Sequence, residues 1–447
     1  MDHLVDNDTK DFCWHLSKSK TQGLLEALFP NSVLFMSSHQ ITMSDVLNVL
    51  QNKKLYGMTK GVEEHWVGLL KSKGKNMTMA EESMVMFLNS ILEAVKNITR
   101  ERTNRSSHSF SYYSSTYGWH DHHRKWHARG AKKIFTGSYL QWKPDLVLSP
   151  NGAGSDWRDV LVFGEMKSRN NSDTQRASYT EVSGKTSVLL YTQDGRHAAP
   201  SLWILGSHIG LSFFNWGGPL KTHCIDIHTN PEIFLHIIVS LTTASFFQLG
   251  FNVLLLNDSG DKCVMIAWKG GLETKEVTIE NLLFISDIMH GCGTTVWGCS
   301  MDFKSNNPDS TSDSESVALR WPHMQRSVVI KDSWIDPLWK YTEESILALL
   351  NATGVIGIPM LVHKEQVQGP HPTRPNALIN KSTHLLQSIL SEASYSADHR
   401  QYQLQVLLWL ITKPIGFEIL GFNSLAELLI MFIDYVMGMS NSLITIP

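Results

Sequence analysis

The stretch Val328-Val329-Ile330-Lys331-Asp332-Ser333-Trp334 decides how the rest of this sequence is interpreted. β-Branched residues favour strands, so the run predicts a strand that carries a lysine on an apolar support. A lysine held in this way is typical of a strand that delivers an ammonium group to the phosphates of a nucleotide. The interpretation therefore requires a phosphate-binding loop before the strand and a carboxylate partner after it.

A glycine-rich turn precedes this strand. The run GCGTTVWG contains Gly291 and Gly293 and leads into another predicted strand through Val296. Glycines allow backbone amides to approach phosphate groups closely, so the turn is a candidate phosphate-binding loop. An acidic, serine-rich stretch, residues 306–316, follows and is predicted to be a loop.

A predicted helix after the strand supplies the carboxylate. Glu343 opens it and is followed by apolar residues at +3, +4 and +7, which define one face of the helix. This spacing predicts that Glu343 pairs with Lys331, and Glu344 is the alternate. An unrelated α+β domain with a buried lysine–glutamate pair is the competing interpretation.

A second group of candidate residues lies on a predicted hairpin. Lys143–Ser149 reads as one strand and Asp159–Lys167 as the returning strand, with a turn-rich loop between them. If the hairpin folds about its middle, Asp145 lies across from Glu165, and Lys167 shares a face with Glu165 because side chains alternate along a strand. Two carboxylates and one lysine are therefore predicted to converge.

This arrangement resembles the core motif of the PD-(D/E)xK nuclease superfamily. The resemblance implies that Asp145 and Glu165 hold a divalent metal and that Lys167 orients the attacking water. A degenerate nuclease-like fold and an unrelated hairpin with a cross-strand ion pair are the alternatives. Glu93 is the best candidate for a further acidic residue on a preceding helix.

Composition limits the possible partners. The chain has 447 residues, a net charge of −3 and five cysteines without metal-type spacing, which indicates an intracellular protein with reduced thiols, cytoplasmic or nuclear. No uninterrupted apolar run approaches the roughly 20 residues of a spanning helix, so no membrane segment is expected. The basic segment 100–133 is a possible nucleic-acid site, and a solvated loop is the alternative.

The pieces KPDLVL, WRDVLVFGEMKS, GCGTTVW and VVIKDSW together resemble the fungal-type protein kinases. The resemblance implies a kinase fold with ATP and Mg²⁺ as cofactors. It implies that Lys331 binds the phosphates, that Glu343 holds Lys331, and that the loop at Gly291 and Gly293 covers the phosphates. The spacing departs from the usual pattern, because Val296 lies where a third glycine is expected.

We therefore expect a mixed α/β protein in three parts. Residues 1–133 form a mostly helical region with the basic loop, 134–275 a nuclease-like α/β domain, and 276–447 a kinase-like upper lobe with the start of a lower lobe. The sequence contains no Asp-Phe-Gly, so we expect a truncated, catalytically incomplete kinase. A pseudokinase-like interaction module is the alternative, with a protein partner on the uncovered apolar face of a helix near residues 425–437.

Overall fold

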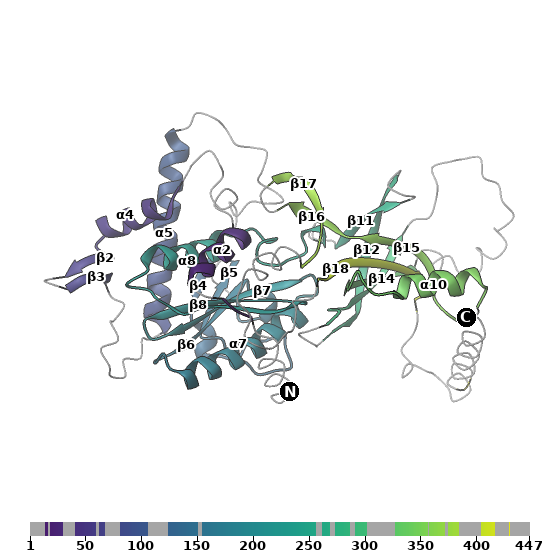
Figure 1. The fold of residues 1–447 in the computed structure, drawn as a ribbon, viewed down its shortest axis with the longest axis horizontal. Coiled ribbons are helices and arrows are strands. Elements are labelled where there is room, and N and C mark those ends of the chain that lie inside the picture. The colour runs from purple at the N-terminus through teal and green to yellow at the C-terminus, as the bar shows by residue number, and fades with distance from the viewer. Residues whose placement is uncertain are drawn as a thin grey trace.

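Two large β-sheets with attached helices, and two small two-stranded hairpins, make up the described part of the molecule (Figure 1). The computed structural model describes residues 14–16, 18–29, 41–59, 62–67, 81–105, 124–150, 154–255, 262–268, 273–286, 291–301, 327–355, 357–371, 374–383, 404–415 and 429. The expected lower-lobe helix, apart from Leu429, and residues 106–123 of the basic segment lie outside these ranges. Within them, no helix is both long and apolar enough to cross a membrane.

The first sheet runs in the order β1-β9-β8-β7-β6-β5-β4, with β10 paired to β8. Its strands are β1 (Trp14–Leu16), β4 (Lys125–His127), β5 (Leu146–Ser149), β6 (Val162–Lys167), β7 (Ala198–Leu205), β8 (His208–Asn215), β9 (Gly218–Thr222) and β10 (Ile225–Asp226). The predicted hairpin is present, because β5 and β6 pair antiparallel. Helix α7 (Ser172–Thr192) then crosses over so that β7 lies parallel to β6.

Helices pack on both faces of this sheet. The helices α2 (Lys18–Leu28), α4 (Met43–Asn52), α5 (Glu81–Arg105) and α8 (Pro231–Thr243) share one apolar core with alternate residues of the strands. Leu146 and Leu148 point into this core, whereas Val147 points into a second core that contains residues of α7. The short elements α6 (Arg129–Lys132), β2 (Tyr56–Thr59) and β3 (Val62–Trp66) complete the region. The described part of residues 1–133 therefore belongs to the same folded unit as the first sheet.

The second sheet has the order β11-β12-β13-β14-β18-β15, and its neighbouring strands are antiparallel. Its elements are β11 (Cys263–Trp268), β12 (Glu273–Ile285), β13 (Thr295–Met301), β14 (Ser327–Ile335), β15 (Met360–Gln366) and β18 (Val406–Lys413), with helix α10 (Glu343–Ala352). A small hairpin, β16 (Gln368–His371) and β17 (Arg374–Asn380), is inserted between β15 and β18. Strand β11 pairs with β12, so the second sheet begins at Cys263. The domain boundary expected at residue 275 therefore falls inside strand β12.

The two sheets share a continuous apolar core. Side chains of β14 and β18 that point toward the first sheet, including Trp334 and Trp409, belong to the same buried cluster as Phe214 and Trp216. A hydrogen bond of 3.2 Å joins His197 Nε2 to Asp332 Oδ2 across this contact. The face of β14 that carries Lys331 is the opposite one, since adjacent residues of a strand alternate.

One predicted strand is wrong. The apolar run SVLLY predicts a strand over residues 187–191, but these residues form the last part of α7. A short apolar run does not distinguish a buried strand from a buried helix by its periodicity. The structure requires a helix here, because β6 and β7 are parallel and need a crossover connection.

Candidate functional site

Lys331 and Glu343 form an ion pair on the outer face of the second sheet. Helix α10 starts beside Lys331 because the hydroxyl of Thr342 accepts the backbone N–H of Ser345 at 3.2 Å and so caps the helix. This capping makes Glu343 the first helical residue, where the helix dipole favours a carboxylate. The Lys331 and Glu343 side chains are 29% and 51% exposed, so an incoming ligand can reach the pair.

A row of side chains extends from this pair across the sheet. Val296 on β13 lies directly opposite Lys331, and Lys331 lies opposite Leu410 on β18. Leu410 in turn lies opposite Lys364 on β15, which pairs with Glu344. Directly opposed residues point to the same face, so Val296 and the two lysines line one surface. Sequence reasoning missed Lys364, because only the pairing of β18 with both β14 and β15 brings it into this row.

The two glycines of the candidate phosphate loop have different surroundings. Gly291 has a φ of +128° and no atom within 4 Å of the position that a Cβ would take. Gly293 has a φ of +48°, and a Cβ there would lie 2.1 Å from the ring of Trp216. The structure therefore explains Gly293 by close packing against the first sheet, whereas Gly291 borders open space. Residues 287–290 of this loop lie outside the described residues.

The acidic cluster on the first sheet is built as the hairpin register predicts. Leu146 pairs with Gly164, which brings Asp145 beside Glu165, and Asp145 Oδ2 accepts the N–H of Met166 at 2.8 Å. Lys167 shares the face of Glu165, and the charges of Glu165 and Asp145 both act on it. The unexpected components come from helix α7, which faces these strands.

Helix α7 contributes a carboxylate and a lysine that sequence reasoning missed. Lys167 Nζ donates to both carboxylate oxygens of Glu181, at 2.7 and 2.8 Å. Lys185 Nζ lies 2.5 Å from Glu165 Oε1 in an ion pair that is not aligned as a hydrogen bond. The side chains of Lys185 and Glu165 are only 4% and 1% exposed, so this pair is almost completely removed from water.

Burial controls the protonation of these carboxylates. Burial raises the pKa of Glu165 to about 8, although the charge of Lys185 opposes the rise. Burial also raises the pKa of Asp145, against the hydrogen bond from Met166. Burial opposes the charge of Lys167, but its contacts with Glu181 and the charges of Glu165 and Asp145 together raise its pKa. Glu165 therefore retains a proton more readily than an ordinary glutamate.

These residues do not fit the divalent metal that the sequence suggested. Asp145 is held by a backbone N–H, and the carboxylates of Glu165 and Glu181 are each paired with a lysine. Two unit charges 4 Å apart interact by about 4 kcal/mol at an effective dielectric constant of 20, and a divalent ion beside the ammonium of Lys185 doubles this repulsion. In the described ranges, no three histidine, cysteine or acidic residues form a group that could hold a metal ion.

The acidic residue expected on the preceding helix is not Glu93. Its side chain is 55% exposed and pairs with Lys96 at 3.1 Å on the surface of α5. The residue of α5 whose charge acts on Asp145 is instead Glu81, which raises the pKa of that carboxyl further. Glu81 is the first residue of this helix.

Two buried arginines, Arg196 and Arg124, have structural roles. Arg196 is buried and donates to the backbone carbonyls of Val160, Leu161 and Leu249, at 3.0, 2.6 and 3.1 Å. In the basic segment, Arg124 is buried and donates to the carbonyl of Thr242 at 3.2 Å. The guanidinium of Arg124 is therefore committed to the fold rather than presented to a nucleic acid.

Comparison with known proteins identified one family. The family model described as fungal protein kinase matches residues 143–445. This match includes both the hairpin with Asp145 and Glu165 and the whole of the second sheet. No curated protein and no solved structure matched the chain.

Proposed function

The chain belongs to the fungal protein kinase family, and we propose that the face of the second sheet around Lys331 binds the phosphates of ATP. The ion pair between Lys331 and Glu343 carries this proposal, since kinases use such a pair to hold the lysine against the α- and β-phosphates. The side chains of Lys331 and Glu343 are both accessible to solvent, so a nucleotide can reach them.

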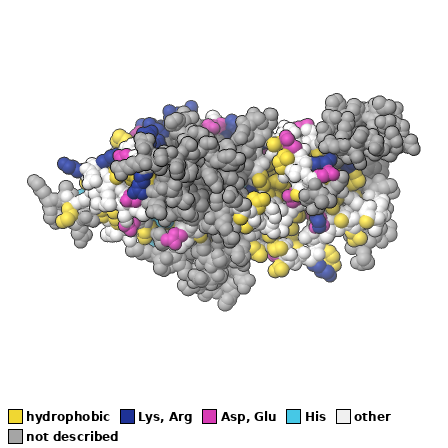
Figure 2. All heavy atoms as spheres, turned by 90° about the horizontal axis from the view of Figure 1, so that it is seen from above, with side chains coloured by type: hydrophobic (Ala, Val, Ile, Leu, Met, Phe, Trp, Pro, Cys, Tyr) yellow, Lys and Arg dark blue, Asp and Glu magenta, His cyan; other side chains and the backbone are white. Residues whose placement is uncertain are grey.

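The surface beside the pair also suits a nucleotide. Val296 lies opposite Lys331 on one side and opposite Phe284 on the other, and Phe284 is 54% exposed. This row offers apolar surface for a base next to a cation for phosphates. Figure 2 shows hydrophobic side chains beside lysine and acidic side chains over the region of the second sheet.

We limit this proposal to nucleotide binding. Phosphoryl transfer also requires Mg²⁺, held in kinases by an Asp-Phe-Gly aspartate and a catalytic-loop asparagine, together with a catalytic aspartate. The sequence contains no Asp-Phe-Gly, so the proposal does not extend to phosphoryl transfer. The acidic cluster at Asp145 is proposed as a charge-compensated part of the core and not as a nuclease centre.

Calorimetric titration of the full chain with Mg-ATP tests the proposal. Lys331→Met should weaken binding by about tenfold or more, because a charge-assisted hydrogen bond contributes about 1.5–3 kcal/mol. Lys340→Met removes the same charge from an exposed position just before α10 and should bind like the unmodified chain. Equal affinity in all three proteins would refute the assignment of Lys331.

A phosphotransfer assay on the same proteins separates binding from chemistry. We expect no sustained turnover by the unmodified chain. Turnover that disappears with Lys331→Met would show that the expectation of catalytic incompleteness is wrong, while leaving the binding proposal intact.

A further inference from the structure

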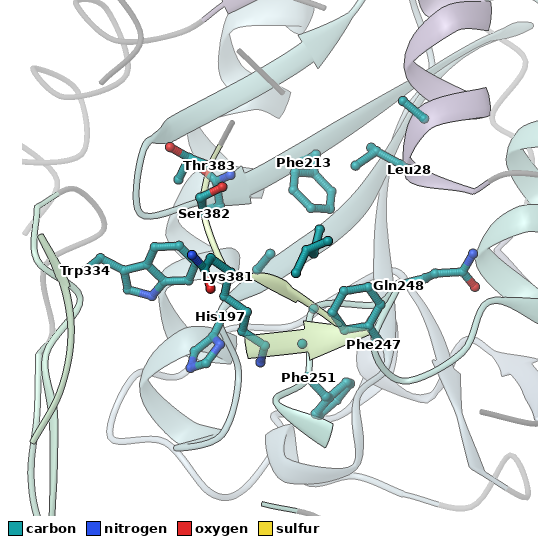
Figure 3. Close-up of a pocket in the computed structure, with 17 residues that line it drawn as sticks. Leu28, His197, Phe213, Phe247, Gln248, Phe251, Trp334, Lys381, Ser382 and Thr383 are labelled. Carbon is teal, nitrogen blue, oxygen red and sulfur yellow. The ribbon is translucent and has the colours of Figure 1, made fainter. Parts of the chain in front are cut away.

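A cavity of about 160 Å³ lies where the two sheets meet (Figure 3). Helix α2 and strands β7 and β8 contribute to it from the first sheet, together with the segment after α8. Strand β14 and the inserted hairpin β16–β17 contribute from the second sheet. The cavity is therefore formed only when the two sheets are packed together.

The walls of this cavity are mainly aromatic and aliphatic. They include Leu28, Phe213, Phe247, Phe251, Trp334 and Ile379. A cavity of about 150 Å³ with walls of leucine, isoleucine and phenylalanine binds benzene, so this volume suits a ligand with one or two small rings. Ile379 is 39% exposed, so the cavity is open to solvent at β17 and a ligand can enter there. Aromatic walls also favour an aromatic ligand, because rings attract each other edge to face.

The polar groups at the cavity exclude a charged ligand. Lys381 is the only lysine, arginine or acidic residue in the lining, and its ammonium donates to Asn252 Oδ1 at 2.6 Å. Burial lowers the pKa of Lys381 to about 8, against the opposing charge of Asp332 behind the lining. Figure 3 shows this end of Lys381 lying near His197 and away from Leu28. Burial lowers the pKa of His197, so its imidazole is neutral near pH 7. The one ammonium of the lining therefore already has Asp332 as its counter-charge, so a charged ligand would bring an unpaired charge into the cavity, which is costly.

We propose that this cavity is a binding site for a small neutral aromatic compound of about the size of indole. Such a ligand contacts both sheets at once and stabilises their packing, because a compound that binds the folded state raises its stability by mass action. Trp334 contributes to the site three residues after Lys331 on the same strand. The proposal does not depend on ATP binding, so the two can fail separately.

Calorimetric titration of the full chain with indole, and with benzoate as a charged counterpart, tests the proposal. Indole should bind saturably and raise the midpoint of thermal unfolding, whereas benzoate should do neither at the same concentration. The absence of saturable indole binding, or equal binding of benzoate, would overturn the proposal and leave the cavity as a packing defect.

Two variants that fill the cavity from different elements locate the binding. Ile379→Trp on β17 and Ala27→Leu on α2 should each weaken indole binding by about tenfold or more, since one methylene in a pocket changes affinity by about 10–200-fold. Leu378→Trp is the matched control, because Leu378 is adjacent, 62% exposed and outside the lining. Undiminished indole binding in both filling variants would refute the location of the site. If one of the two variants does not fold, the result for the other decides the location.

Discussion

The buried pair of Lys185 and Glu165 gives the sharpest quantitative prediction. Lys185→Met removes the ammonium 2.5 Å from Glu165 and leaves a carboxyl that is 1% exposed without its cation. Removing one partner of a buried ion pair costs about 3–5 kcal/mol when the remaining group stays charged. Burial raises the pKa of Glu165 to about 8 although Lys185 opposes the rise, so this pKa is higher still in the variant. The cost should therefore begin to grow as the pH rises above 8 and reach its full size only above the pKa of the variant.

Below pH 8 the variant should be less damaging. Glu165 is then protonated and neutral, so Lys185→Met costs about 1–3 kcal/mol, the range for a buried polar group that loses its partner. Replacing both residues, as Lys185→Met with Glu165→Leu, should restore most of the loss at either pH, because apolar residues of similar volume substitute well for a buried pair.

Urea unfolding at pH 6 and pH 9 measures the stability of four proteins: the unmodified chain, Lys185→Met, Glu165→Leu and the double variant. The comparison shows how strongly the two residues depend on each other. The surface pair of Lys96 and Glu93, 3.1 Å apart, is the matched control. The same set of variants, with Lys96→Met and Glu93→Leu, should give an interaction energy between the two residues of less than about 1 kcal/mol. A double variant as unstable as the sum of the two single variants would refute the reasoning. So would a cost for Lys185→Met that is the same at both pH values.

Three further predictions concern single residues. Glu165 holds its proton more tightly when folded, so the stability it contributes is complete below pH 4.5 and is lost as the pH rises to about 8; Glu165→Gln should remove this slope from unfolding midpoints measured across that range. Arg196→Lys should lower stability by about 2–3 kcal/mol in urea unfolding, since lysine cannot reproduce the forked contacts with three backbone carbonyls, and an unchanged midpoint would contradict their importance. Gly293→Ala should lower the thermal unfolding midpoint by the equivalent of about 1–3 kcal/mol, because its methyl group meets the Trp216 ring and the backbone φ is positive. Gly291→Ala, also at positive φ but in open space, should cost less, and equal effects would rule out the contact as the cause.

Local sequence patterns predicted the parts of the two clusters that depend on short spacing. The pairing of Lys331 with Glu343 spans 12 residues and follows from a strand and a capped helix. The convergence of Asp145 and Glu165 follows from a single hairpin. In each case the pattern of one or two consecutive elements was sufficient.

Contacts between distant segments could not be predicted in this way. Lys185 was missed because the apolar run after it was assigned to a strand, which removed the helix that carries it. The contact of Gly293 with Trp216 depends on how the two sheets pack, which no local pattern encodes. The sequence therefore predicted that Asp145 and Glu165 lie together, but it did not predict Lys185, whose charge compensates the buried Glu165.

The hydrogen bond between His197 and Asp332 has a mechanical consequence for Lys331. Asp332 and Lys331 are adjacent on β14 and point to opposite faces, so the strand that presents the lysine is anchored from behind to the first sheet. Tilting this strand would break the hydrogen bond and separate the apolar core that both sheets share. The first sheet thus sets the orientation of the lysine.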